Sequence, residues 1–249
     1  GPMIRSLFIP EEGCVWGCFD YNQQEPRLVV HYASLQQLPS AFTVVDAYKE
    51  GNADFHKIVA DMAQIPRTQA KVINLGLFYG MGKAKLQAEL GVSQEKAENL
   101  FATYHSKVPF VKQLMNAVSQ RAQQRGQIRT LLGRLCRFHL WEPNYFGIHK
   151  ALPHEQAILE HGPGIKRAFT YKSLNKLIQG SAADMTKKCM LELYKEGIVP
   201  HIQIHDELDI SVKDDKEAKR IVEIMESAVE LEIPNKVDYE SGTNWGEIH

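Results

Sequence analysis

The chain of 249 residues is 44% hydrophobic, with 29 basic and 30 acidic residues and a net charge of −1. It is long and apolar enough to bury a sizeable core in one large domain or two smaller ones, which excludes a disordered or fibrous protein. It shows no apolar run of about 20 residues, no signal peptide, and only four cysteines without metal-site spacing, so we expect a globular cytoplasmic protein with structural thiols and no membrane partner.

The first predicted element is a short apolar strand that ends at a carboxylate. The run 14–19 is followed by Asp20, and Asn22 can cap the helix that comes next. Pro26 is tolerated only in a first helical turn, which places the helix start within a residue or two of Gln24. Asp20 therefore lies where a strand meets a helix, a rigid place for a ligand or catalytic carboxylate, although a simple neighbour of a helix cap would look the same.

A second predicted helix, over 67–80, combines two cations and two large residues on one stripe. They recur at every fourth position: Arg67, Lys71, Leu75 and Tyr79. The two cations lie toward the positive end of the helix dipole, where they are unfavourable unless an anion binds there, and a triphosphate would satisfy both. An amphipathic helix with its basic face in solvent is the alternative, but it does not explain the two large residues on that face.

The middle of the chain is predicted to be helical and basic. Helices are expected over 82–89, 93–104 and 109–124, followed by a β-like run in 127–138 and a long surface insertion over 141–164. From residue 101 to residue 140, a segment called the basic stretch below, every formal charge is positive: Lys107, Lys112, Arg121, Arg125, Arg129, Arg134 and Arg137. Such a stretch suits a polyanion, although a solvated basic face explains it equally well on its own.

A long helix follows over 174–194. Asn175 and Gln179 lie four residues apart on one of its faces, and Gly180 beside them would let another segment approach closely. Near the end of the chain, residues 216–233 are amphipathic and are predicted to form a helix that covers a sheet.

The segment 199–212 is the one around which the chain is organised. Its apolar residues recur at period two, which indicates a strand with one buried face: Ile202, Ile204, Leu208, Ile210 and Val212. Asp206 falls within this series, and an unpaired carboxylate on an apolar face costs several kcal/mol. The chain must therefore turn at His205 and Asp206, or a cation such as Mg²⁺ must neutralise the charge. A polar turn that happens to contain an Asp is the simpler explanation of these residues alone.

Four segments together carry a resemblance to a known family. The family is that of the family A DNA polymerases, the bacterial polymerase I type: its two carboxylate motifs resemble residues 20–27 and 205–207. Its nucleotide-binding helix resembles residues 67–80, and its Gln-Gly-Thr-Ala-Ala-Asp helix resembles residues 175–184. The four segments have the order and spacing of the family. The match is specific because all four motifs occur in this order and spacing, whereas each motif alone would be weak evidence. The resemblance points to a bacterial cell or a virus-infected one, and to the palm and fingers portion of a viral or naturally split enzyme.

The resemblance implies a role for each matching residue. Asp20 and Asp206, with Tyr21, would hold two Mg²⁺ ions. Lys71 would donate a proton to pyrophosphate. The residues implied for the deoxynucleoside triphosphate are Arg67, Lys71, Leu75, Tyr79, Glu25, His56 and Gln23, with Glu25 as the steric gate against ribose. The residues implied for primer-template DNA are Asn175, Gln179, His205, Arg134 and Arg137.

The implied fold is α+β, with an antiparallel palm sheet flanked by helices and an inserted, mainly α-helical fingers domain. We expect the palm at 4–45 and 165–249 and the fingers, with the basic hairpin and the insertion, at 46–164. Thumb and exonuclease domains are expected to be absent, and a separate polypeptide could supply them.

Several departures and two alternative functions stay open. Leu75 replaces the family's aromatic residue, and Pro26 follows Glu25 where Leu is usual. A single-subunit RNA polymerase would share the two aspartates and the Arg/Lys helix, although Glu25 argues against it. An inactive or partner-dependent nucleic-acid-binding module is the other alternative.

Overall fold

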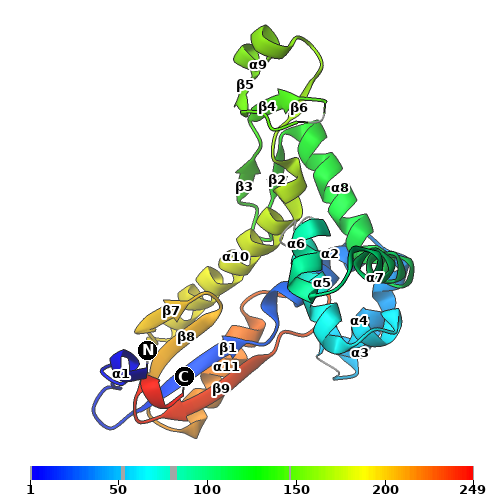
Figure 1. Ribbon diagram of the computed structural model, residues 1–249. Coiled ribbons are helices and arrows are strands. Elements are labelled where there is room, and N and C mark those ends of the chain that lie inside the picture. Colours follow the sequence, from blue (N-terminus) through cyan, green and yellow to red (C-terminus); the bar gives the residue numbers. More distant parts are fainter. Residues whose placement is uncertain (1, 52–53, 79–82, 146, 249) are drawn as a thin grey trace. The chain divides into compact units, whose positions relative to one another are not determined.

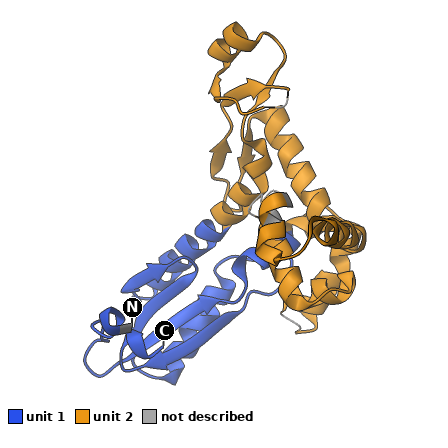
Figure 2. Cartoon of the chain, in the orientation of Figure 1, with its two compact units in different colours: residues 1–31, 182–249 blue, residues 32–181 orange. Residues whose placement is uncertain are grey.

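The computed structural model describes residues 2–51, 54–78, 83–145 and 147–248. The chain forms two compact units (Figure 2). Unit 1 comprises residues 1–31 and 182–249, and unit 2 comprises residues 32–181. The fold class is confirmed as α+β, since antiparallel sheets combine with many helices.

Unit 1 is built on a four-stranded antiparallel sheet of order β7-β8-β1-β9 (Figure 1). The strands are β1 (Val15–Tyr21), β7 (Ile202–Ile204), β8 (Glu207–Val212) and β9 (Val237–Gly242). Central strand β1 pairs with β8 from Val15↔Val212 to Asp20↔Glu207, and with β9 on its other side. The first and last parts of the sequence thus share one sheet.

One face of this sheet packs against α11 (Asp215–Ser227), as the amphipathic pattern predicted. Phe19, Leu208 and Ile210 are buried on this side, and the Tyr21 hydroxyl donates to the carbonyl oxygen of Met225 at 2.6 Å. The helix begins after Asp214, whose carboxylate accepts from the Glu217 N–H at 2.8 Å.

The prediction that Ile202 and Ile204 share a buried face with Leu208 is wrong. Ile204 pairs directly with Glu207 across a two-residue turn, and Gln203 pairs with Leu208. Residues directly opposite in a hairpin lie on the same face, so this turn reverses the phase of the alternation. Ile202 and Ile204 are consequently on the other face from Leu208 and are only half-buried.

Unit 2 is mainly helical. Its helices are η1 (Pro39–Ala41), α3 (Phe42–Lys49), α4 (Phe55–Ala63), α5 (Arg67–Phe78), α6 (Lys83–Leu90), α7 (Gln94–Lys107), α8 (Pro109–Arg125), α9 (His154–His161) and η2 (Thr170–Lys172). Local signals set their ends: Ser93 caps α7, Pro109 opens α8, and Gly126 ends α8 at φ +67°. These ends agree with the prediction.

The segment expected to be a surface insertion has a fold of its own. Strands β4 (Leu140–Pro143), β5 (Leu152–Pro153) and β6 (Ile165–Arg167) form a three-stranded sheet with α9 after β5. Arg167 ties this sheet to the end of α8, because its guanidinium donates to the carbonyl oxygens of Gln123 and Phe138 and lies 4.5 Å from the Trp141 ring. The strands and the helix within this segment were not predicted from the sequence.

Two long helices have residues in both units. They are α2 (Gln24–Leu35), whose start at Gln24 was predicted, and α10 (Ser173–Lys195). The short elements α1 (Pro2–Arg5) and η3 (Trp245–Glu247) complete unit 1, and β2 (Gln127–Arg129) and β3 (Leu135–Arg137) form a hairpin in unit 2. None of the helices among the described residues is long and apolar enough to cross a membrane.

Candidate active site

A tight turn between β7 and β8 lifts Asp206 out of the sheet. The turn consists of His205 and Asp206, and His205 adopts the left-handed conformation at φ +53°. The side-chain amide of Gln203 donates to the His205 carbonyl oxygen at 2.7 Å and supports this conformation. The turn that was expected at His205 and Asp206 is therefore confirmed.

Asp20 lies beside this turn. It is opposite Glu207 in the β1–β8 register, and the N–H of the next residue, Tyr21, donates to the Asp206 carbonyl oxygen at 3.3 Å. A cavity of about 250 Å³ joins the three carboxylates, and its lining is Arg5, Asp20, Ile204, His205, Asp206, Glu207 and Trp245. We call Asp20, Asp206 and Glu207 the carboxylate turn.

One acid of the carboxylate turn, Asp206, is disfavoured in its ionised form. Burial raises the pKa of Asp206 above its usual value, and a backbone hydrogen bond and the nearby His205 only partly oppose that rise. Asp20, Asp206 and Glu207 line the same cavity, and carboxylate oxygens are the donors that Mg²⁺ and other hard cations prefer, so these residues could hold a divalent metal ion. Tyr21 could contribute only its backbone carbonyl, because its side chain is buried and its hydroxyl bonds to Met225.

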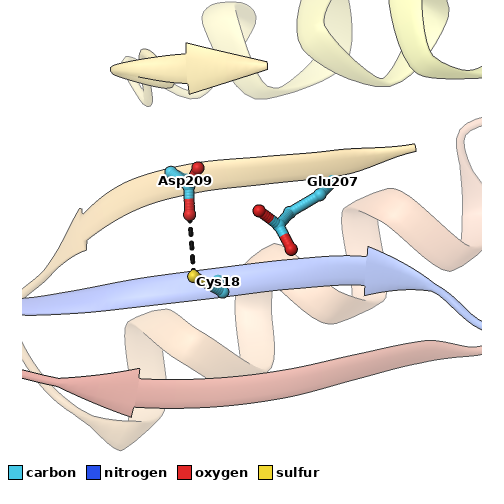
Figure 3. Close-up of side chains that lie close together, drawn as sticks. All are labelled: Cys18, Glu207 and Asp209. Atoms are coloured by element: carbon cyan, nitrogen blue, oxygen red, sulfur yellow. Dashed lines mark hydrogen bonds between the residues drawn. The ribbon is translucent and has the colours of Figure 1, made fainter. Parts of the chain in front are cut away.

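A buried acid next to the carboxylate turn was not predicted. Asp209 is 0% exposed, and one of its carboxylate oxygens accepts from the Cys18 thiol at 2.7 Å and from the Trp16 indole at 3.1 Å. Figure 3 shows Asp209 and Glu207 projecting from β8 toward Cys18 on β1. Burial, with the carboxylate of Asp209, raises the pKa of the Cys18 thiol, which keeps it protonated as the donor. In sequence, Asp209 occupies a position between two apolar residues that alternation assigns to solvent.

The predicted phosphate-binding residues lie in unit 2. Arg67 and Lys71 are exposed on α5, and Leu75 is half-buried on the same helix. Arg67 is not isolated, because its Nε lies 2.8 Å from a carboxylate oxygen of Asp54. Burial alone would raise the pKa of Asp54, but its hydrogen bonds from Arg67 and from the Lys57 N–H lower it. Tyr79 lies outside the described residues.

His56 belongs to a buried group of three side chains from α4, α5 and α7. Its Nδ1 lies 3.0 Å from the side-chain nitrogen of Asn74, and the Asn74 oxygen accepts a hydrogen bond from the Tyr104 hydroxyl. All three side chains are buried. We call His56, Asn74 and Tyr104 the His56 network. Burial lowers the pKa of His56, and the nearby Arg67 and Lys71 lower it further against the opposing effect of Asp54.

The β2–β3 hairpin packs on α10 at Gly180. A Cβ atom there would lie 2.6 Å from Thr130 Cγ2, so only glycine fits. The Arg134 guanidinium donates to the Gly180 carbonyl oxygen at 2.6 Å, and the Ser181 hydroxyl accepts from the Leu131 N–H at 3.0 Å. The close approach predicted at Gly180 is thus made by this chain's own hairpin.

The predicted DNA-facing residues near this contact lie on the surface to different degrees. Gln179 and Arg137 are exposed, and Asn175 is half-buried. In unit 1, His205 is exposed, Glu25 is half-buried in the first turn of α2, and Gln23 precedes that helix at φ +52°. The structure brings the carboxylates together in unit 1 and groups Arg67, Lys71 and His56 in unit 2.

Comparison with known proteins gives one consistent result. The sequence model of the protein family "DNA polymerase family A" matches residues 1–247 of this chain. A DNA-directed DNA polymerase of Pseudomonas phage M6 is 37% identical over 98% of this chain and 40% of its own length, and DNA polymerase I of Geobacillus stearothermophilus is 33% identical over 98% of this chain and 27% of its own.

A solved structure agrees with these relatives. The POL domain of Pol1 from M. smegmatis, in complex with DNA primer-template and dNTP, superposes with a TM-score of 0.77 at 26% identity. The superposition covers 98% of this chain and 42% of that one. The chain therefore spans less than half the length of each of these proteins.

Proposed function

The chain belongs to DNA polymerase family A, and we propose that it is a catalytic portion that adds deoxynucleotides to a primer 3′ end by two-metal phosphoryl transfer. The observation that carries the proposal is the carboxylate turn, where Asp20 and Asp206 line one cavity from strands that are far apart in sequence. The chain spans less than half the length of these relatives, so we also propose that this chain is itself catalytically active.

Asp20 and Asp206 would hold the metal ions, with the Tyr21 carbonyl as a further ligand. Two Mg²⁺ ions bound there would activate the primer 3′-hydroxyl and neutralise charge on the triphosphate and its leaving pyrophosphate. Asp20 is exposed at its strand end, so it can reach a ligand without rearrangement of the buried sheet. Asp206 is held on a two-residue turn whose geometry the sheet fixes on both sides.

The α5 cations would bind the triphosphate. Arg67 and Lys71 lie one turn apart and are both exposed, so both can contact phosphate oxygens as negative charge develops on them. Lys71 would then donate a proton to the leaving pyrophosphate. Arg67 would exchange its Asp54 partner for phosphate, or keep it through Nε and bind phosphate through its terminal nitrogens.

The remaining assignments concern the sugar, the base and the duplex. Glu25 would exclude a ribose 2′-hydroxyl with Gln23 beside it, and Leu75 and Tyr79 would contact the nucleotide. Asn175 and Gln179 would touch minor-groove acceptors that every base pair presents, which senses shape without reading sequence. The side chains that would hold the DNA backbone are His205, Arg134 and Arg137. A separate polypeptide or a preceding segment would add the grip of a thumb.

Single-turnover primer extension with deoxynucleotides and Mg²⁺ tests the proposal. Asp20→Asn and Asp206→Asn should each lower the rate by at least about 100-fold, because each removes a charged metal ligand. Asp238→Asn is the matched control: it removes a carboxylate opposite Asp20 on β9 that does not line the cavity. Equal rates for all three variants would contradict the metal assignment, and no activity of the unaltered chain, alone or with an N-terminal polymerase segment, would favour a binding module.

A further inference from the structure

Asn74 stands between two groups that could each be a hydrogen-bond donor or acceptor. Its side chain is 0% exposed, and it contacts His56 Nδ1 through one end of the amide and the Tyr104 hydroxyl through the other. The three residues come from three different helices of unit 2, so their geometry is fixed by the helix packing rather than by local sequence.

The chemistry of these groups fixes the direction of each hydrogen bond. A fully buried Tyr104 hydroxyl needs an acceptor, and the amide oxygen of Asn74 is the acceptor that it reaches. The amide nitrogen of Asn74 then faces His56 at 3.0 Å, and an NH₂ group can only donate. His56 Nδ1 must accept, so it carries no proton, and the single proton of the ring lies on Nε2.

The reverse arrangement is unfavourable. If the amide were turned over, its NH₂ would point at Tyr104, and the hydroxyl hydrogen would have no acceptor in any contact found among the described residues. A doubly protonated His56 in the observed arrangement would place an N–H against an NH₂ at hydrogen-bonding distance, which is repulsive.

We propose that Asn74 and Tyr104 are positioning residues that hold His56 as the neutral tautomer with its proton on Nε2, so that His56 offers the incoming triphosphate a hydrogen-bond donor without a third positive charge. The inference rests on the proposed function for its ligand but not for the tautomer itself. It predicts that the imidazole binds phosphate oxygens with the same protonation on either side of neutral pH.

The groups around His56 support a neutral ring. Arg67 and Lys71 on α5 disfavour an imidazolium, and Asp54 at the start of α4 favours one. Asp54 is already engaged by Arg67 at 2.8 Å and by the Lys57 N–H at 3.0 Å, and Tyr104 on α7 is neutral. Two cations thus supply the charge for the triphosphate, and His56 supplies direction.

Nuclear magnetic resonance of the whole chain with ¹⁵N-labelled histidine tests the tautomer without any need for catalysis. In the unaltered protein, the His56 Nδ1 signal should be that of an unprotonated nitrogen from about pH 6 to pH 8. Asn74→Asp should reverse this, because a carboxylate accepts from both Tyr104 and an Nδ1–H. The His56 pKa should then rise by at least about one unit, whereas Asn99→Asp, which adds the same charge on the exposed face of α7, should leave it unchanged.

Tyr104→Phe is the second variant, and it keeps the ring while it removes the hydroxyl that orients the amide. The amide can then turn, and the population of the Nδ1–H tautomer should increase. A protonated Nδ1 in the unaltered protein, or a tautomer and pKa that neither variant moves, would overturn the inference and leave the proposed polymerase function untouched.

A kinetic measurement links the tautomer to the nucleotide. In Asn74→Asp, the KM for dTTP should become dependent on pH between about 6 and 8, while the pH profile of kcat keeps its original form, because only the binding of phosphate changes. A pH profile of KM equal to that of Asn99→Asp would show that His56 does not bind the triphosphate, even where the tautomer is as described.

Discussion

The carboxylate turn of unit 1 and the His56 network of unit 2 are organised in opposite ways. In the carboxylate turn, three acids line one cavity and burial raises the pKa of Asp206, so the ionised form of Asp206 is disfavoured. In the His56 network, every hydrogen bond has one donor and one acceptor and no group needs a charge.

Under the proposed function, the two regions illustrate two ways of preparing a protein for a charged ligand. A carboxyl group whose ionised form is disfavoured by burial costs stability until a cation binds to it, whereas a neutral buried network fixes the direction of a hydrogen bond and contributes stability of its own. Removal of the Asp206 charge should therefore stabilise the carboxylate turn, whereas removal of the Asn74 amide should destabilise the His56 network.

The largest effect is expected from salt on DNA binding by the basic stretch. This segment is a third region to compare, in which only exposed charge would bind the ligand. Every cation of the basic stretch is exposed. If roughly six to ten phosphates are contacted, affinity for primer-template should fall about 10³-fold to 10⁵-fold between about 50 and 200 mM salt. Fluorescence anisotropy across a salt series measures this, and tight binding that salt does not weaken would show that another surface holds the duplex.

The second effect concerns the stability of the His56 network. Asn74→Leu keeps the volume but leaves His56 Nδ1 and the Tyr104 hydroxyl buried without partners, and it should cost about 2–4 kcal/mol of the free energy of unfolding. Urea denaturation monitored by circular dichroism gives the value. Asn99→Leu, at an exposed position of α7, is the control and should change stability by less than about 0.5 kcal/mol.

The third effect tests whether Glu25, in the first turn of α2, acts by shape instead of charge. Glu25→Ala should raise the ratio of ribonucleotide to deoxyribonucleotide incorporation by about 10-fold to 100-fold, since the clash that it removes acts only on a 2′-hydroxyl. Glu25→Gln keeps the shape and should leave the ratio near its original value. A ratio that rises equally in both variants would assign the selection to charge, and an unchanged ratio in Glu25→Ala would remove Glu25 from sugar selection.

The smallest effect is the stability gained by Asp206→Asn. Because the pKa of Asp206 is raised in the folded state, the folded protein loses stability as pH rises from the ordinary carboxyl pKa through the raised one. The variant should therefore be more stable than the unaltered chain at pH 7, by less than about 1 kcal/mol, and the difference should vanish below about pH 4. Thermal melting at several pH values without divalent metal checks the sign, and a loss of stability at pH 7 would contradict the raised pKa.

The sequence was most informative where one residue type decides the local structure. Gly126, Pro109 and Ser93 are start and stop signals that do not depend on the rest of the chain, so the start of α7 and both ends of α8 were predictable, whereas α7 ends at Lys107, three residues beyond its predicted end. The turn at Asp206 was predictable for a related reason, since a carboxylate in an apolar strand has few stable places.

What the sequence did not reveal depends on partners that are distant along the chain. The burial of Asp209 follows from Cys18 and Trp16, which lie on another strand, and alternation alone assigns it to solvent. The small sheet of 140–167 depends on Arg167 reaching back to α8. In the sequence, nothing distinguishes Asn74 from an ordinary helical residue, because its hydrogen-bond partners His56 and Tyr104 lie on other helices.

The carboxyl titration of Asp206 with and without Mg²⁺ tests the central claim most directly, because it reports the charge balance of the carboxylate turn itself. Carbon-13 resonance of labelled aspartate in the whole chain should show a raised Asp206 pKa without metal and a fall on addition of Mg²⁺, and the fall should be lost in Asp20→Asn and retained in Asp238→Asn. An Asp206 pKa that Mg²⁺ leaves unchanged in the unaltered chain would show that the turn is not a metal site.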